Sequence, residues 1–341
     1  MSRASPFVKI RRYFFFSLLA LLLFLMGTEI AARLIVKKPP VFLPDEMFWS
    51  LERHTNLFGQ YDRLSSFDIE GRQVKREKTT GVFRVICLGS SSTYGAGVAD
   101  RSLAFPGVLG RLLPKTEVIN AGFGGYNSYQ LFIYFSEVLS QLKPDAVVFY
   151  YGGNENYGFS AKTFYPRVKK IVADFRAAGV TDPRLLREAV QYGVSNRFSL
   201  EMYRLLNHSQ AFLWWRSRVV QAEQARQMMH RPMVVNDPRR KIEPTFDQII
   251  RSMAQQCRLW SGRLLLCPEI ASTLNFADPD VPGTMFRLCA EGGAVCLDAL
   301  HASPGLTDPA LFLDSTHLNE TGHERLAATL LPMVKALAEA R

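Results

Sequence analysis

Residues 88–95 form a short polar segment that could hold a nucleophilic serine. They read Leu-Gly-Ser-Ser-Ser-Thr-Tyr-Gly and directly follow an apolar run. A nucleophilic serine needs a sharp turn between a strand and a helix, because that turn exposes the hydroxyl and leaves backbone N–H groups free. The glycines at both ends of the segment permit such a turn. Taken alone, the segment is somewhat more typical of a plain loop.

Two further segments offer hydrogen-bond donors for a developing negative charge. Residues 120–128 read Asn-Ala-Gly-Phe-Gly-Gly-Tyr-Asn-Ser, and residues 151–155 read Tyr-Gly-Gly-Asn-Glu. A glycine lets the backbone approach a ligand closely and donate its N–H. An asparagine amide is an uncharged donor that can be aimed at an oxyanion. Each segment by itself is equally compatible with a tight turn.

A fourth segment pairs an acid with a base near the C-terminus. Asp314 precedes His317 by three positions in the stretch Asp-Ser-Thr-His-Leu-Asn. An aspartate at this spacing can hold an imidazole in the tautomer that accepts a proton from a serine. An isolated occurrence is more typical of a surface loop whose aspartate caps the next turn.

These four segments need elements that bring them together, and the sequence predicts a parallel α/β sheet. Short runs that are apolar on both faces, as expected for strands covered by helices, occur at 83–88, 117–120, 146–151, 263–267 and 295–297. Helical periods occur at 105–113, 129–142, 246–259 and 321–340. Since ligands bind at the carboxyl ends of the strands in such sheets, the four segments are expected to converge on one edge.

Together the four segments resemble those of the SGNH or GDSL hydrolase superfamily, whose four blocks supply a Ser, a Gly, an Asn and a His. The resemblance covers the chain from about residue 82 to the C-terminus, apart from an insertion. Residues 89–95 resemble the block Gly-Asp-Ser-x-x-x-Gly and place Ser91 as the nucleophile. The second and third blocks place Gly125 and Asn154 as oxyanion donors, and the last supplies Asp314 and His317 as acid and base.

The resemblance implies a fold and a reaction. The fold is a three-layer α/β/α sandwich with a five-stranded parallel sheet, the flavodoxin-like SGNH fold. In the reaction, His317 takes the proton of Ser91, which attacks an ester carbonyl. The N–H groups of Ser91 and Gly125 and the amide of Asn154 hold the oxyanion, and neither a metal nor a cofactor is needed.

Several conspicuous residues stay outside this constellation. Ser90 and Glu155 stand where the family usually has Asp. Neither position is a triad member or an oxyanion donor, so the chemistry is expected to survive. Five further histidines are expected to be structural, with the last of them a competitor for the role of His317: His54, His208, His230, His301 and His323.

The N-terminus predicts a membrane segment. Four basic residues within the first twelve precede an apolar run at 13–26, which continues more weakly to 35. The run reaches the ~20 residues of a full span only if Glu29 and Arg33 lie near the far interface. A cleaved signal peptide competes with a retained anchor, and the anchor is favoured because Glu-Ile-Ala-Ala at 29–32 is a poor cleavage site. The basic flank places this end in the cytoplasm and the rest outside it, on the periplasmic face of a bacterial inner membrane.

The sequence therefore predicts three parts, namely a cytoplasmic tip with a transmembrane anchor (1–37), a linker with short strands (38–81) and the hydrolase domain (82–341). Residues 156–241 contain 16 Lys+Arg and 6 Asp+Glu, and the rest of the chain contains 25 of each, so the net charge of +10 lies in this one stretch. The stretch, about 156–244, is too long for a connection and is predicted to be a basic helical insertion beside the site. It suits anionic lipid or acidic polysaccharide, and no nucleic acid partner is expected.

One segment of the insertion combines aromatic and basic residues. Residues 212–216 read Phe-Leu-Trp-Trp-Arg, and Arg218 follows closely. Aromatic side chains beside arginines suit a membrane interface, a glycan-stacking surface or a lid over the site. A helix buried against the core is an equally good interpretation.

The five cysteines are an odd number and have no metal-ligand spacing. Cys87 lies inside an apolar strand and is expected to be a buried thiol. Cys289 and Cys296 flank a Gly-Gly turn, and in an oxidising compartment they could form a disulfide.

The leading hypothesis is a membrane-anchored serine esterase whose substrate is an acylated glycan or a lipid ester. A second hypothesis is an O-acyltransferase that uses the same residues to acylate a cell-envelope polysaccharide, and the access of water to the site separates the two. A third is a noncatalytic envelope protein that binds a glycan or a partner, against which the intact Ser, Asp and His argue. The sequence gives no indication of the oligomeric state.

Overall fold

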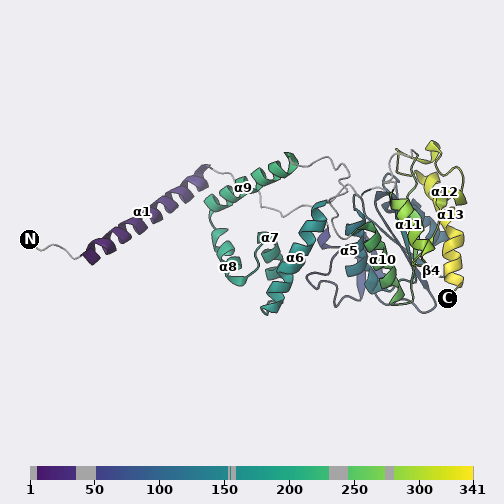
Figure 1. The fold of residues 1–341 in the computed structure, drawn as a ribbon, viewed down its shortest axis with the longest axis horizontal. Helices are drawn as coiled ribbons and strands as arrows, with labels where there is room; N and C mark the ends of the chain where they lie inside the picture. The colour runs from purple at the N-terminus through teal and green to yellow at the C-terminus, as the bar shows by residue number, and fades with distance from the viewer. Residues whose placement is uncertain are drawn as a thin grey trace, which may run out of the picture. The chain divides into compact units, whose positions relative to one another are not determined.

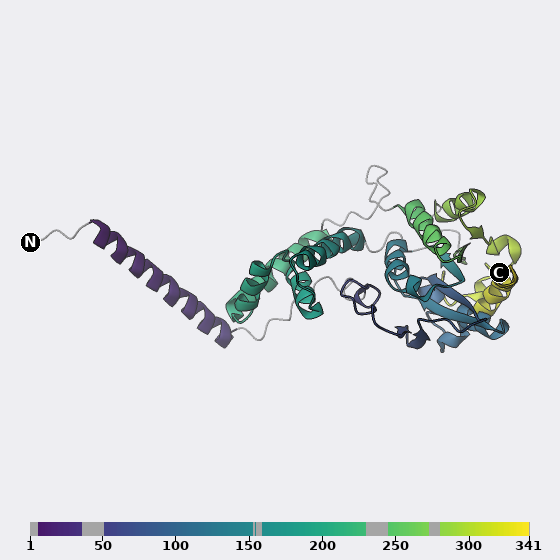
Figure 2. The ribbon, with the colours of Figure 1, turned by 90° about the horizontal axis from the view of Figure 1, so that it is seen from below.

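The computed structural model describes residues 6–35, 51–152, 154, 159–229, 245–272 and 280–340 (Figures 1 and 2). The chain divides into two compact units. The sheet unit comprises Asp45–Lys169 and Pro238–Arg341, and the helical unit comprises Met1–Pro44 and Lys170–Asp237.

A five-stranded parallel sheet forms the centre of the sheet unit. Its strands lie in the order β4 (Thr116–Gly122), β3 (Phe83–Gly89), β5 (Ala146–Tyr151), β6 (Arg263–Pro268) and β7 (Val295–Cys296). Every neighbouring pair is parallel. The five predicted strands are therefore confirmed, with bounds that differ by two residues at most.

The register of the sheet brings the ends of its strands to one edge. Gly89 of β3 lies opposite Gly122 of β4 and opposite Tyr150 of β5, and Tyr151 lies opposite Pro268 of β6. The segments that follow these four strands therefore leave the sheet at the same edge, as the alternation of strands and helices predicted.

Helices cover both faces of the sheet. On one face, α4 (Phe105–Leu112) packs against α13 (Glu320–Glu339), and their buried side chains join those of alternate strand residues in one core cluster. The other face carries α5 (Ser128–Glu137) and α10 (Phe246–Arg258), which contact each other (Figure 1). This arrangement is the predicted three-layer α/β/α sandwich.

Local sequence signals fix where these helices begin and end. Asn127 and Thr245 each form a capping box with the residue three positions later, which satisfies two free N–H groups at the start of α5 and of α10. The helix predicted over 129–142 is interrupted, because α5 ends at Glu137 and a short 3-10 helix, η2 (Leu139–Leu142), follows.

Residues 51–81, expected to be a linker with short strands, pack closely against the sheet. They contain an antiparallel hairpin, β1 (Ser66–Ile69) with β2 (Arg72–Lys75). The buried side chain of Arg84 ties this segment to the sheet, because it donates to the backbone carbonyls of Lys75 and Arg76 and pairs with Glu117. Six apolar side chains of the segment are also buried, namely Leu51, Leu57, Phe58, Phe67, Ile69 and Val74.

The helical unit contains α1 (Pro6–Ile35) and the helices α7 (Pro183–Tyr192), α8 (Arg197–Leu206) and α9 (Gln210–Met229). A further helix, α6 (Phe159–Ala177), begins in the sheet unit and enters the helical unit. The helices between β5 and α10, namely α6, α7, α8 and α9, form the predicted helical insertion. Within α1, Tyr13–Ile35 is long and apolar enough to cross a membrane, and none of it is buried.

The cysteines divide into one disulfide and three buried thiols. Cys289, in α11 (Asp280–Ala290), is bonded to Cys296 in β7, with their Cα atoms 5.8 Å apart. This is the pairing that the sequence suggested. Cys87, Cys257 and Cys267 are free and buried, as expected for Cys87.

Candidate active site

Ser91 lies in a tight turn at the end of β3. It is the first residue of the short helix α3 (Ser91–Tyr94), which follows the strand after a single intervening residue. A Cβ on Gly89 would lie 2.1 Å from Oγ1 of Thr93 and 2.3 Å from the carbonyl oxygen of Tyr150, so this position accepts only glycine. Gly95 ends the helix at φ +90°, in the left-handed region that favours glycine.

Ser91, His317 and Asp314 form one hydrogen-bonded series. The Nε2 atom of His317 lies 2.8 Å from Oγ of Ser91, and its Nδ1 atom lies 2.6 Å from Oδ2 of Asp314. Because a carboxylate only accepts hydrogen bonds, Nδ1 carries the proton that it shares with Asp314. In the neutral imidazole Nε2 is then the acceptor for the Ser91 hydroxyl.

The loop that carries the acid and the base is held by its own hydrogen bonds. Oδ1 of Asp314 accepts the backbone N–H groups of Thr316 and His317, each at 2.8 Å. Burial by itself would raise the pKa of Asp314, but the hydrogen bonds from the His317 side chain and from these two N–H groups outweigh it and hold the pKa well below its usual range. The loop closes by a bridge between Phe312 and Leu318.

The two remaining sequence-predicted residues, Gly125 and Asn154, occupy neighbouring loops at the same edge. Gly125 is exposed at φ +78°, and a Cβ there would meet nothing within 4 Å, so the backbone conformation and not crowding favours glycine. Nδ2 of Asn154 donates to the carbonyl oxygen of Tyr126 at 3.2 Å. The Asn154 amide is therefore attached to the loop that contains Gly125.

The two positions that depart from the family pattern are placed differently. Ser90 is buried in the turn, and its side chain makes no capping hydrogen bond to α3. Glu155 lies outside the described residues.

Glu269 is a site residue that the sequence analysis missed. It follows β6 directly, and its carboxylate accepts a hydrogen bond from Oγ of Ser92, the residue after the candidate nucleophile. Burial raises the pKa of Glu269 to about 7, although hydrogen bonds from Ser92 and from the backbone N–H of Gly152 oppose the shift. A signal was present, because an acidic residue stands where an apolar strand ends.

His323, the expected competitor for the role of His317, is a structural residue. It is buried, and its Nδ1 atom accepts the backbone N–H of Phe105 at the start of α4, at 3.2 Å. Burial lowers the pKa of His323 to about 4, so it is neutral near pH 7.

His54 is also structural, and it lies behind the loop of Gly125. Its two ring nitrogens each lie 2.8 Å from an oxygen, one of Tyr126 and one of Glu70. Its ring also contacts that of Phe123 edge-on. Both aromatic residues belong to the second sequence motif, so His54 supports the loop that presents Gly125.

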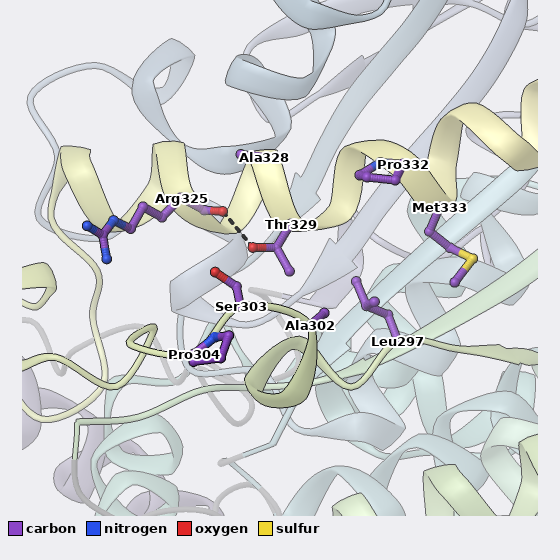
Figure 3. Close-up of a pocket in the computed structure, with 9 residues that line it drawn as sticks. All are labelled: Leu297, Ala302, Ser303, Pro304, Arg325, Ala328, Thr329, Pro332 and Met333. Atoms are coloured by element: carbon purple, nitrogen blue, oxygen red, sulfur yellow. Dashed lines mark hydrogen bonds between the residues drawn. The ribbon is translucent and has the colours of Figure 1, made fainter.

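A surface pocket of about 590 Å³ lies between α12 (Ala299–Ala302) and α13 (Figure 3). Small and apolar side chains supply most of its lining, together with Ser303, Thr329 and Arg325. The Thr329 hydroxyl already donates to the carbonyl oxygen of Arg325 within α13. None of the candidate catalytic side chains lines this pocket.

A family model matches most of the chain. The model of the GDSL-like lipase/acylhydrolase family matches residues 87–325. No curated protein sequence matches the chain. Among solved structures, similar ones include a lipase/acylhydrolase from Enterococcus faecalis, with 16% identity, TM-score 0.42, and 75% of this chain and 96% of that chain covered. Another is a catalytic mutant of the acetylxylan esterase Axe2 from Geobacillus stearothermophilus, with 14% identity, TM-score 0.40, and 75% and 95% covered.

The family match extends over well more than half of the chain and includes the turn of Ser91 and the loop of Asp314 and His317. It agrees with the sheet order and with the hydrolase chemistry that a serine, an imidazole and a carboxylate in hydrogen-bonded series can perform. This chain belongs to the GDSL-like lipase/acylhydrolase family and is a hydrolase that acts on ester bonds.

Proposed function

We propose that this protein is a membrane-anchored serine esterase in which Ser91, His317 and Asp314 form the catalytic triad. The observation that carries the proposal is the pair of short contacts on the two sides of the His317 ring, one to Ser91 and one to Asp314. An imidazole that donates from one nitrogen and accepts at the other is prepared to remove a proton from the serine.

In the first half of the reaction, Ser91 attacks the carbonyl carbon of the ester while Nε2 of His317 takes its proton. The carbonyl oxygen of the ester becomes negatively charged, and the N–H groups of Ser91 and Gly125 are proposed to stabilise it. An amide nitrogen has two N–H donors, so Asn154 can keep its bond to the Tyr126 carbonyl and direct the second N–H to the oxyanion. The carboxylate of Asp314 stabilises the imidazolium that forms.

The second half of the reaction regenerates the enzyme. The oxyanion returns to a carbonyl as the bond between that carbon and the alkoxy oxygen breaks. The imidazolium of His317 gives its proton to the departing alcohol, and the acyl group stays on Ser91. Water then attacks the acyl group on Ser91 while His317 takes a proton from the water. The carboxylic acid leaves as Ser91 recovers its hydrogen.

We propose O-acetyl groups of an extracytoplasmic glycan, or a lipid ester, as the substrate. Two proteins of similar fold are described as an acetylxylan esterase and a lipase/acylhydrolase, which motivates both substrate classes. The location rests on α1 and on the Cys289–Cys296 disulfide, since disulfides persist in oxidising compartments outside the cytoplasm.

A fluorophosphonate probe tests the proposal, because it reacts only with an activated serine. The full-length chain in detergent is expected to be labelled at Ser91 and to hydrolyse p-nitrophenyl acetate. Ser91→Ala is expected to lose both, whereas Ser90→Ala, in the same turn, is expected to retain both. Labelling or turnover that persists in Ser91→Ala removes this serine from the mechanism.

The substrate class needs a separate measurement. Release of acetate from acetylated xylan and of fatty acid from phospholipid by the same preparation distinguishes the two proposed classes. Transfer of the acyl group to an added sugar in preference to water would instead favour the acyltransferase.

A further inference from the structure

Glu29, near the end of α1, caps the start of a helix that lies 180 residues later in the chain. Its carboxylate accepts the hydroxyl of Ser209 at 2.7 Å and the backbone N–H groups of Gln210 and Ala211 at 3.0 and 3.2 Å. These N–H groups are among those that a helix leaves without an internal partner. A carboxylate also interacts favourably with the positive end of the helix dipole, so Glu29 fixes the beginning of α9.

Arg33, one turn further along α1, completes the connection. Its Nε atom lies 2.7 Å from the carboxylate of Glu29, and its Nη2 atom donates to the backbone carbonyl of His208 at 3.2 Å. The two charged residues of the apolar span Tyr13–Ile35 therefore have defined partners in the helical unit. Removal of α1 as a signal peptide would break all of these contacts.

The position of Glu29 along α1 gives the depth at which α9 begins. Glu29 follows Tyr13, the first residue of the apolar span, by 16 positions. At 1.5 Å per residue this corresponds to ~24 Å, against a hydrocarbon layer of ~30 Å. If α1 crosses the membrane with Tyr13 at the near edge of the hydrocarbon layer, the beginning of α9 thus lies ~6 Å from the far edge.

The helix before this junction has an exposed apolar stripe. In α8, Phe198, Met202, Leu205 and Leu206 recur at helical spacing, and Phe198 and Leu205 are 77% and 65% exposed. Large exposed apolar patches mark interaction surfaces in soluble proteins.

The helix after the junction has an aromatic and basic surface. Trp214 and Trp215 of α9 are 43% and 57% exposed, and Val219 lies one turn after Trp215. The guanidinium of Arg218 lies 5.6 Å from the centre of the Trp214 ring. Tryptophan with arginine is typical of the layer where lipid headgroups meet the hydrocarbon.

We propose that α8 and α9 lie on the surface of an anionic lipid bilayer, held at the outer end of α1 by Glu29 and Arg33. Figure 1 shows α9 beginning beside the C-terminal end of α1. Cationic side chains are in excess in this part of the sequence, and anionic headgroups attract them. The inference rests on the anchor in the proposed function and is independent of the Ser91 chemistry.

Brominated lipids, which quench tryptophan fluorescence on contact, test the proposal. The full-length chain is placed in nanodiscs of brominated phosphatidylcholine with phosphatidylglycerol, and it is compared with the double variant Trp214→Phe and Trp215→Phe. The difference between the two isolates the fluorescence of these tryptophans. It is expected to be quenched, and more strongly with phosphatidylglycerol than without it. An unquenched difference signal, as for a lid or a glycan-binding surface, overturns the proposal.

A substitution at Glu29 tests the role of this residue separately. Glu29→Leu keeps the span apolar but removes the cap of α9. The position of α9 then depends only on its weak contacts with the bilayer surface. Quenching of the two tryptophans is therefore expected to fall to about half or less. Ala31→Leu, at an exposed position of the same helix, is the matched control and is expected to keep full quenching. Equal quenching in both variants contradicts the role of Glu29.

Two measurements on the same samples separate this inference from the proposed function. Hydrolysis of p-nitrophenyl acetate reports on the Ser91 chemistry, and its absence leaves a positive quenching result intact. The intact mass of the protein reports on α1, and a chain that has lost α1 in cells overturns the inference even where the esterase is active.

Discussion

Asp314 holds His317 by two atoms, since Oδ2 contacts the ring at Nδ1 while Oδ1 accepts the backbone N–H of the same residue. The side chain of Asp314 therefore fixes both the orientation of the imidazole and the conformation of the loop that carries it. Because the acid stands three residues before the base, both the ring and its loop are held by contacts within the loop itself.

Asp314→Asn is expected to reduce kcat for p-nitrophenyl acetate by about 10²–10⁴-fold, because an amide nitrogen facing Nδ1 favours the wrong tautomer of His317. KM is expected to change little, since Asp314 does not contact the substrate in the proposed reaction. Asp308→Asn is the matched control, because Asp308 is an exposed aspartate that caps the neighbouring helix η3 (Pro309–Leu311). Full activity in Asp314→Asn would contradict the assigned role.

Glu269 predicts a pH-dependent difference in stability. Its folded pKa of about 7 lies above the ordinary 4.5, so the folded state binds the extra proton between these values. The contribution of Glu269 to the free energy of unfolding therefore falls as pH rises from about 4.5 to 7. Glu269→Gln stays neutral at every pH. As pH rises from 5 to 8, its free energy of unfolding is therefore expected to increase by on the order of 2 kcal/mol relative to that of the parent.

Thermal unfolding of the parent and of Glu269→Gln at the two pH values measures this difference. Glu320→Gln, which removes an exposed carboxyl at the start of α13, is the matched control. A constant difference between parent and Glu269→Gln would show that the Glu269 carboxyl does not titrate in this range.

Gly89→Ala is expected to destabilise the turn of Ser91 and to abolish esterase activity. The new methyl group would meet the Tyr150 carbonyl oxygen at 2.3 Å, and forced overpacking costs about 1–3 kcal/mol or more. Gly110→Ala in α4 is the control, since its Cβ would lie 3.6 Å from Val118, an ordinary contact. Activity and melting temperature of both variants give the comparison, and a fully active Gly89→Ala would show that the turn can relax.

The disulfide predicts a thiol count and a change in stability. The denatured, unreduced protein is expected to react at three of its five cysteines, and at all five after reduction. Replacing both Cys289 and Cys296 by Ser is expected to lower the free energy of unfolding by about 2 kcal/mol, because the bridge closes a short loop. Five reactive thiols without reduction would contradict the disulfide.

The fold was predictable because the strands of a parallel sheet are short, apolar on both faces and separated by helical periods. All five strands follow from this pattern, as do four of the helices that cover the sheet, namely α4, α5, α10 and α13, whereas α11 was not predicted. The position of Ser91 follows from its place directly after the first of these strands. The pattern does not predict the contacts of residues whose partners lie far away in the sequence.

Residues 51–81 illustrate this limit. Their polar composition resembles a linker, but contacts with residues far away in the sequence fix them to the sheet, among them the bonds of the buried Arg84 and the bond from Arg72 to the Val118 carbonyl. Glu269 was missed for a similar reason, because its partner Ser92 is 177 residues away. The charges at Glu29 and Arg33 were read only as residues near an interface, although they bind the helical unit.

The bond between Phe105 and His323 has a consequence for how the site is aligned. The acid and the base share one self-contained loop just before α13, whereas Ser91 precedes α4, and this buried bond joins the two helices. A slide of α13 along α4 would carry the whole acid–base loop away from the serine without disturbing the loop itself. Since a misplacement of about 1 Å can reduce a rate by about 10²-fold, turnover should respond to the fit between these two helices well before the sheet loses its order.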